Sequence, residues 1–336
     1  MATRQAKLIR LVVVVLLLCG PSSSGWGASL SGCGVSLSGC GANLSARGAN
    51  LLGSRDQSRG PQGSAPPQSS GSGPARRVVS LVPNVTEMLF AVGAGTQVVG
   101  VSSYDDFPPE TKALPRVGAL LDPDTERILS LRPDLVVVYG SQTELERQFT
   151  RAGIRVYPYR HGGIDSILQA IRDLAGLTGH PAEGDRVVRQ VRSQLDAVGM
   201  RVRGQQRPRT MLVIGRDAGA LRGVYVSGGV GFLHELLDIA GGNDVFGDIK
   251  REAVQPSNET LIVRAPEVII ELHPGEQPAA DALQKERAVW NLLASVPAVR
   301  TGRVHLLYGG YLVAAGPRIG HAAEALAGVL HPDTVK

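Results

Sequence analysis

The sequence predicts an α/β protein in which one long helix joins two Rossmann-like lobes. The helix is indicated at residues 181–206, where apolar side chains recur at spacings that form a single helical stripe, namely Val187, Val191, Leu195, Val198 and Val202. Short apolar runs alternate with helical patterns on both sides of this segment, which is typical of βα units around a parallel sheet. A repeat that spans the helix supports the same division.

The internal repeat pairs segments of the two predicted lobes at a constant offset. Residues 122–138 resemble residues 255–271, and matched residues lie 133 positions apart, since 256 − 123 = 133. The matched pairs are Pro123 with Pro256, Glu126 with Glu259, Pro133 with Pro266, and Asp134 with Glu267. A second match pairs Glu87 with Glu235 and Gly93 with Gly241. Because self-similarity over a long period reflects a repeated unit of structure, the lobes are expected to share one fold.

The first lobe is predicted to cover residues 77–180. A β-branched run opens it, and Asn84 or Thr86 is expected to cap the helix that follows. After the next strand, Pro108 and Pro109 hold the chain extended, which predicts a loop beyond a strand end, where ligands tend to bind. Further strands and helices are expected to alternate at 134–140, 143–153, 154–159 and 164–179.

The second lobe is predicted to cover residues 207–336, after the connecting helix. It opens with a β-branched strand. The expected elements after it are a glycine-rich segment at 225–242, the repeated helix and strand at 255–271, a helix around Trp290, a strand at 303–309 and a last helix near Gly316. About five short strands are expected in each lobe, a usual number for one sheet.

Composition and charge limit the function classes. A chain of 336 residues with 43% hydrophobic content can build about two domains with cores of their own. The net charge of +5 is concentrated at the start, because residues 1–77 hold eight basic side chains and one acidic one. Residues 78–336 therefore hold 35 − 8 = 27 basic and 30 − 1 = 29 acidic side chains. With neither a basic stripe nor stacking aromatic residues, no nucleic-acid partner is expected.

The first 76 residues indicate export. Residues 1–27 are typical of a signal peptide, because three basic residues precede an apolar run of about ten residues, which is too short to span a bilayer. Residues 28–76 are dominated by small and polar residues, which predicts a disordered tether. The expected location is the periplasm, or a lipid anchor at the outer face of the cytoplasmic membrane.

All three cysteines lie in the first forty residues, so no thiol remains for a disulfide or a zinc–thiolate site in the folded part. Cys33 and Cys40 each end an LSGC segment that resembles a bacterial lipobox, which makes them candidates for lipidation. These segments also belong to a seven-residue repeat that starts at Ala28, so they can equally be products of that repeat. Ordinary signal cleavage after Gly27 is the other open possibility.

Catalytic motifs are incomplete throughout the chain. The glycine-rich SGGVGFLHE segment lacks the spacing of a phosphate-binding loop, and Ser227 lies outside a nucleophile elbow. The nearest acid or base candidates are Asp105, Asp106 and His161, which leaves an enzyme acting on a metal chelate or small ester as a remote alternative. The chain is therefore expected not to be an enzyme and to hold neither a metal nor a cofactor of its own.

Several segments between residues 77 and 332 resemble one family, the helical-backbone (class III) periplasmic binding proteins that feed ABC importers of cobalamin, haem and ferric siderophores. They are RVVSLVPNVTEMLFAVGAG, VVGVSSYDDFPPE, LPRVGALLDPDTERILSLRPDLVVV and GPRIG. The resemblance implies a rigid connecting helix, a ligand cleft between the lobes, and a monomer that delivers its ligand to a membrane permease dimer.

Glu126 and Glu259 occupy the same place in the two halves of the repeat. Each lies early in a predicted helix, where a carboxylate interacts favourably with the helix dipole, and this local role is one interpretation. The family resemblance implies a second one, in which each glutamate docks against arginines of the permease.

The SSYDDFPPE and DPDTERI segments are most similar to the cobalamin-binding branch of the family, so a corrinoid is the expected ligand. A broad, rather apolar ring needs flat side chains and a few hydrogen-bonding partners at its edge. The candidate ligand-binding residues are Pro83, Tyr104, Leu120, Tyr139, Arg216 and Tyr311.

Two other ligand classes stay open. Haem would require an axial ligand, for which Tyr104 or His161 would serve. An anionic ferric siderophore would require arginines in the cleft, and the candidates are Arg160, Arg216 and Arg222.

Overall fold

The computed structural model describes residues 73–334. The signal peptide, most of the tether and both lipidation candidates, Cys33 and Cys40, lie outside these residues. Within the described part of the chain, no helix is long and apolar enough to cross a bilayer. The folded region begins slightly before residue 77, because Ala75 is buried and its amide donates to the carbonyl of Leu177 at 2.7 Å.

The first lobe contains a four-stranded sheet in the order β2-β1-β3-β4, with every neighbouring pair parallel. Its elements in chain order are β1 (Val78–Ser80), α2 (Pro83–Ala91), a 3₁₀ turn (Gly95–Gln97), β2 (Val98–Val101), a 3₁₀ turn (Pro109–Ala113), α3 (Thr125–Ser130), β3 (Leu135–Tyr139), α4 (Thr143–Arg151), β4 (Arg155–Tyr159) and α5 (Ile164–Thr178). The expected alternation of strands and helices is confirmed.

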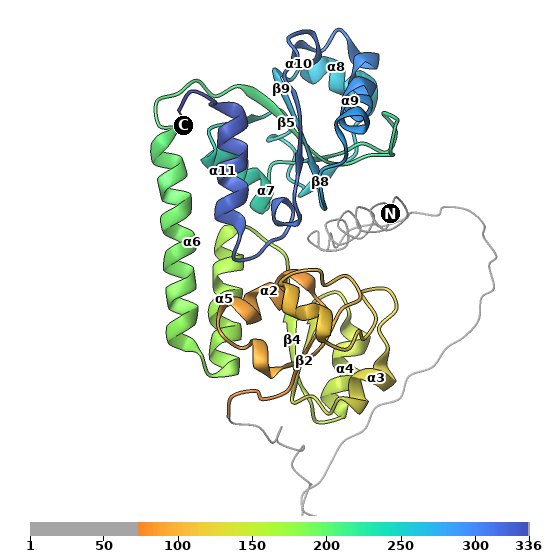
Figure 1. Cartoon of the computed structure of the whole chain (residues 1–336), viewed down its shortest axis with the longest axis vertical. Coiled ribbons are helices and arrows are strands. Elements are labelled where there is room, and N and C mark those ends of the chain that lie inside the picture. The colour runs from red at the N-terminus through yellow and green to blue at the C-terminus, as the bar shows by residue number, and fades with distance from the viewer. Residues whose placement is uncertain (1–72, 335–336) are drawn as a thin grey trace, which may run out of the picture. The chain divides into compact units, whose positions relative to one another are not determined.

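The connecting helix α6 (Pro181–Arg201) begins with a proline in its first turn, where the missing amide hydrogen costs nothing. The predicted apolar stripe is buried along its length. It packs against α5 of the first lobe and α11 (Ile319–Leu330) of the second (Figure 1). One apolar core runs through all three helices. The helix ends before residue 206 because the following turn includes Gly204, whose φ of +80° lies outside the helical region.

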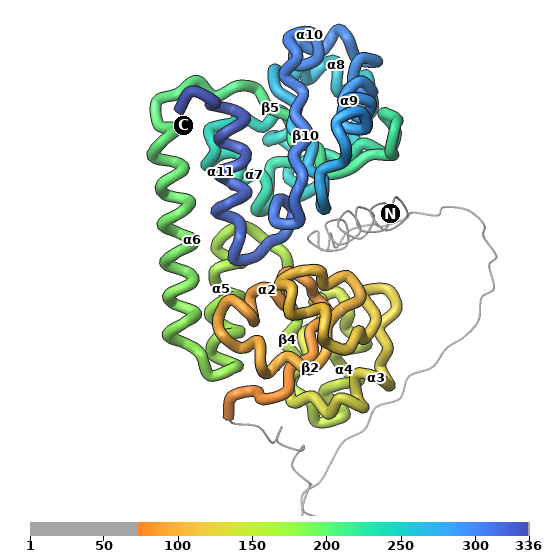
Figure 2. The backbone as a smooth tube through the Cα atoms, viewed as in Figure 1, coloured from red at the N-terminus to blue at the C-terminus, as the bar shows by residue number. Residues whose placement is uncertain are grey.

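The second lobe contains a mixed sheet in the order β10-β9-β5-β6-β8, with β7 paired to β5. Its elements are β5 (Arg209–Gly215), β6 (Tyr225–Ser227), α7 (Phe232–Ile239), β7 (Asn243–Asp244), β8 (Ala253–Val254), α8 (Asn258–Arg264), β9 (Val268–His273), α9 (Ala280–Ala288), a 3₁₀ turn (Val289–Leu293), α10 (Pro297–Arg300), β10 (Val304–Tyr308), a 3₁₀ turn (Gly310–Leu312) and α11 (Ile319–Leu330). The chain path in Figure 2 runs from the first lobe through α6 into this lobe.

The sheet of the second lobe differs from the prediction in one respect. Strand β6 pairs antiparallel with both β5 and β8, whereas a parallel sheet was expected. The connection at 216–224 is too short to carry the crossover that parallel neighbours need, so the chain turns back beside β5.

The predicted 133-residue repeat is confirmed in the backbone of the two lobes. Helix α3 is capped by Asp124, which accepts from the Arg127 amide at 2.9 Å, and α8 by Ser257, which accepts from the Thr260 amide at 3.3 Å. After the helices, Arg132 and Ala265 adopt left-handed conformations with φ of +46° and +45°. Both the caps and the left-handed residues are related by the offset of 133, because 124 + 133 = 257 and 132 + 133 = 265.

The same contacts fix each repeated helix to its sheet. In the first lobe, Asp134 accepts from the amides of Arg76 and Arg77, and the Arg77 side chain donates to the carbonyl of Leu131 at 2.7 Å. In the second, Glu267 accepts from the amide of Arg209, whose side chain donates to the carbonyl of Arg264 at 2.6 Å. Each helix is therefore held at its C-terminus by an arginine at the start of the first strand of its lobe, Arg77 just before β1 and Arg209 as the first residue of β5.

One local expectation was wrong. Neither Asn84 nor Thr86 caps α2, because the helix begins at Pro83 and both residues lie inside it. The Asn84 amide instead donates to the Tyr159 hydroxyl and to the Ala315 carbonyl, each at 2.8 Å, so the side chain connects the two lobes.

Candidate functional site

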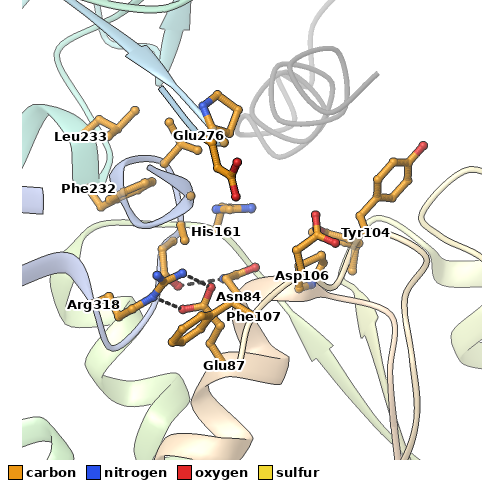
Figure 3. Close-up of a pocket in the computed structure, with 18 residues that line it drawn as sticks. Asn84, Glu87, Tyr104, Asp106, Phe107, His161, Phe232, Leu233, Glu276 and Arg318 are labelled. Atoms are coloured by element: carbon orange, nitrogen blue, oxygen red, sulfur yellow. Dashed lines mark hydrogen bonds and ion pairs between the residues drawn. The ribbon is translucent and has the colours of Figure 1, made fainter. Parts of the chain in front are cut away.

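A cavity of about 370 Å³ lies between the lobes, and both lobes line it (Figure 3). On the first lobe its wall follows the carboxyl ends of β1, β2, β3 and β4, and on the second it includes the start of α7 and the loop after β9. The carboxyl ends of parallel strands form a crevice that commonly binds ligands. The volume is within the range of small-molecule pockets.

Three of the six candidate ligand-binding residues line the cavity, namely Pro83, Tyr104 and Tyr139. Leu120 and Tyr311 do not line it. Leu120 lies before α3 with its carbonyl bonded to Gln142, and Tyr311 contacts the ring of His321 edge to face at 6.5 Å.

Arg216 is found away from the expected cleft position. Its side chain is only 2% exposed, with Nε 2.9 Å from Glu271 and Nη2 2.8 Å from Glu286. Because two carboxylates of the second lobe compensate this guanidinium, it holds that lobe together and presents no charge to the cavity. Its partners are distant in the sequence, which hid this role from pattern reasoning.

A charged pair that sequence reasoning missed forms part of the cavity wall and joins the lobes. Arg318, at the start of α11, binds Glu87 of α2 through two nitrogens, at 2.8 Å from Nε and 2.6 Å from Nη2 (Figure 3). Phe107 lies over the guanidinium at 3.8 Å. Burial raises the pKa of Glu87, while the hydrogen bond and charge of Arg318 act in the opposite direction.

The matched residue of the repeat makes a second link between the lobes. Glu235 of α7 accepts from the amide of Ile164, the first residue of α5, at 2.7 Å. Glu87 and Glu235 therefore each reach the N-terminal end of a helix in the opposite lobe, and those two helices, α5 and α11, both pack on α6. The alignment of these glutamates was the sequence signal that could have revealed the links. We call them the interlobe glutamates.

Glu87→Gln should lower the free energy of unfolding by about 2 kcal/mol, because it leaves the Arg318 guanidinium without a charge partner in a largely buried place. Urea unfolding of the purified chain measures this. Glu183→Gln is the matched control, since Glu183 pairs with Arg186 at 2.6 Å but both side chains are about half exposed, and its effect should stay below about 0.5 kcal/mol. Equal effects of the two variants would contradict a stabilising role for the interlobe pair.

The remaining charges of the cavity are mostly acidic. Asp106 and Glu276 line it and are exposed, and neither has an ion-pair partner among the described residues. Among the described lining residues Arg318 is the one cationic side chain and is paired with Glu87, and Arg160 and Arg222 lie outside the lining. The wall therefore offers hydrogen-bond acceptors and an excess of negative charge.

His161 lines the cavity, and its ring contacts two tyrosines. It stacks on Tyr139 at 6.3 Å and meets Tyr159 edge to face at 5.3 Å. Burial lowers the pKa of His161 to about 4, so the imidazole is neutral at physiological pH. Asp105 lies next to the lining residue Tyr104 but is itself fully buried. No cluster of three or more potential metal ligands occurs within residues 73–334.

Comparison with known families gives a match over most of the chain. The periplasmic binding protein family matches residues 78–309. The vitamin B12-binding protein of Salmonella typhimurium strain LT2 is 30% identical over 258 residues, which cover 76% of this chain and 90% of that protein.

Solved structures show the same fold. The periplasmic vitamin B12 binding protein of Vibrio cholerae is 25% identical with a TM-score of 0.65, over 76% of this chain and 97% of that one. The periplasmic heme-binding protein of Roseiflexus sp. RS-1, in its apo form, is 28% identical with a TM-score of 0.64, over 78% of this chain and 100% of that one. The α/β fold expected from the resemblance is therefore confirmed.

Proposed function

The chain belongs to the periplasmic binding protein family and is an extracytoplasmic substrate-binding protein, and we propose that it captures cobalamin or a related corrinoid for an ABC importer. The similarity to proteins named for vitamin B12 binding supports this ligand. A monomer that delivers the corrinoid to a membrane permease dimer fits the role. The proposed location is the periplasm or, if Cys33 or Cys40 is lipidated, the outer face of the cytoplasmic membrane.

The charge of the cavity is the observation that carries the choice of ligand. A corrin has neutral amides at its rim, and amide hydrogens suit the carboxylates of Asp106 and Glu276. Tyr104 and Tyr139 provide flat side chains for contact area. Haem and anionic ferric siderophores carry carboxylates or other anionic groups, and Arg318, the one cation in the described part of the cavity wall, is already paired. An anionic ligand would therefore meet an excess of like charge.

Haem is the alternative within the same fold. Tyr104 and His161 both line the cavity, and either side chain can supply an axial ligand to iron. The similarity to a heme-binding protein supports this alternative, although less directly than the acidic cavity supports a neutral ligand.

Calorimetric titration of the mature chain with cyanocobalamin, haemin and a ferric catecholate should show the strongest binding for cyanocobalamin. Tyr104→Ala should weaken that binding about tenfold, because it removes a large aromatic contact area. Tyr311→Ala is the matched control and should leave the affinity within about twofold, since Tyr311 is absent from the lining. If cyanocobalamin gives no heat while haemin binds with a Soret shift that Tyr104→Phe removes, the ligand is haem.

Contact with the permease is proposed to involve Glu126 and Glu259. Both are exposed, and they occupy equivalent positions on α3 and α8. A hydrogen bond with Ser257 lowers the pKa of Glu259, which favours its charged form. Two exposed carboxylates in equivalent settings suit a partner that presents the same basic surface twice.

A further inference from the structure

Two exposed apolar side chains accompany the proposed docking glutamates. Leu129 of α3 is 40% exposed and Ile262 of α8 is 42% exposed. They are related by the repeat offset, because 129 + 133 = 262, and each lies three residues after its glutamate. Residues three apart on a helix share one face, so each lobe presents a carboxylate beside an apolar side chain. We call these pairs, Glu126 with Leu129 and Glu259 with Ile262, the docking patches.

The preceding residue in each helix shows that the exposure is specific. Ile128 and Leu261, also related by the offset, are fully buried. In both helices one apolar residue packs into the core of its lobe, and the next residue in the sequence, also apolar, is exposed to solvent. Val263 is 82% exposed and extends the patch of the second lobe, where the first lobe has Ser130.

The docking patches are held rigidly. Each short helix has a side-chain cap at its start, a left-handed residue after its end, and an arginine that binds a carbonyl of its C-terminal end. Left-handed conformations are strained for residues other than glycine, and here the same strain recurs in both lobes. A preordered surface loses little conformational entropy when it binds.

We infer that Leu129 and Ile262 are the apolar contacts of the docking surface, and that each packs into an apolar recess beside a cation on one of two equivalent permease subunits. This inference rests on the proposed function. In protein interfaces, exposed charges chiefly steer encounter and orientation, whereas desolvated apolar side chains slow dissociation. The glutamates would orient the chain on the permease, and the two apolar residues would slow its dissociation from the permease.

The duplication of the patch favours this partner over others. A two-fold symmetric dimer presents one surface twice, and the chain carries matching patches at equivalent positions of its two lobes. Met200 and Leu292 are also exposed, at 68% and 76%, but they lie outside the repeated helices and have no part in such an arrangement. They provide matched controls.

The test uses the cyanocobalamin-loaded mature chain and membrane vesicles from the cells that carry its own importer. Leu129→Ala and Ile262→Ala should each weaken docking about tenfold, mainly through faster dissociation. Met200→Ala and Leu292→Ala should dock as wild type does. Raising the salt concentration should reduce the effect of Glu126→Gln, because exposed charges are screened, and should leave the effect of Leu129→Ala unchanged.

Each contrary outcome has one meaning. If the alanine variants dock normally while the glutamate variants do not, the surface is electrostatic and the inference is overturned. If only one of Leu129→Ala and Ile262→Ala weakens docking, the inference of a two-fold symmetric partner is overturned. Loss of cyanocobalamin affinity in Leu129→Ala or Ile262→Ala would make these residues structural and overturn the inference. If the wild-type chain neither binds cyanocobalamin nor docks, the proposed function fails instead.

Discussion

Reversal of either docking glutamate, as Glu126→Arg or Glu259→Arg, is expected to reduce ligand uptake at least about a hundredfold while ligand affinity stays within about twofold. The new cation would face the basic surface of the permease, and like charges at an interface cost several kcal/mol. Neither glutamate lines the cavity, and both are exposed, so the ligand site should be unaffected. Uptake of labelled cyanocobalamin by cells that carry only the variant, beside calorimetry on the purified chain, separates the two effects.

The control for this result is Glu144→Arg. Glu144 is exposed on α4, and its one ion-pair partner within residues 73–334 is its helical neighbour Arg147 at 2.7 Å, so reversing its charge should change neither uptake nor affinity. If Glu126→Arg lost uptake and ligand affinity in parallel, the role of Glu126 would be local, at the start of its helix, and not in docking. Unchanged uptake in both reversed variants would remove the glutamates from the docking surface.

The parts of the fold that were predicted correctly depend on local chemistry. The α6 stripe, the alternation of strands and helices in the first lobe and the 133-residue repeat are visible as periodicity or repetition along the chain, so they could be recognised from the sequence. The antiparallel strand β6 was missed because its pairing depends on how a short connection turns beside β5. Pairing of distant segments has no signature within the strand itself.

The candidate site shows the same contrast. Pro83, Tyr104 and Tyr139 line the cavity because they lie at or just after strand ends, a position that can be recognised from the sequence. Arg216 is compensated by Glu271 and Glu286, and Arg318 is joined to Glu87 across 231 positions of the chain. An isolated arginine in a sequence does not show whether its charge is already paired, so cleft cations cannot be identified by pattern alone.

Asp105→Asn is expected to stabilise the chain at pH 8 by up to about 4 kcal/mol. Neither carboxylate oxygen of Asp105 has a hydrogen-bond partner of normal geometry within the described residues, and the side chain is fully buried. Burial raises the pKa of Asp105 from 3.8 to about 7, with the Thr86 hydroxyl and the Arg116 charge acting in the opposite direction. A shift of about three units corresponds to about 4 kcal/mol.

The sign of the pH dependence follows from this raised pKa. The folded chain binds the Asp105 proton more tightly than the unfolded chain, so the destabilisation by the carboxylate is complete above about pH 7 and disappears as the pH falls towards 3.8. Wild type should therefore gain stability relative to Asp105→Asn between pH 8 and pH 4. Other carboxyl groups with shifted pKa values, such as Glu252, whose pKa burial raises, are shared by both proteins, so their contributions cancel in this difference.

Urea unfolding at several pH values measures the difference, and Asp134→Asn is the control of opposite sign. The Asp134 carboxylate accepts from the amides of Arg76 and Arg77 at 2.8 and 3.0 Å, so its replacement should destabilise the chain by about 1 to 2 kcal/mol. If Asp105→Asn were also less stable than wild type at pH 8, the buried carboxylate would be compensated by contacts that an amide cannot make. Its charge would then help to hold the loop that positions Tyr104 at the cavity.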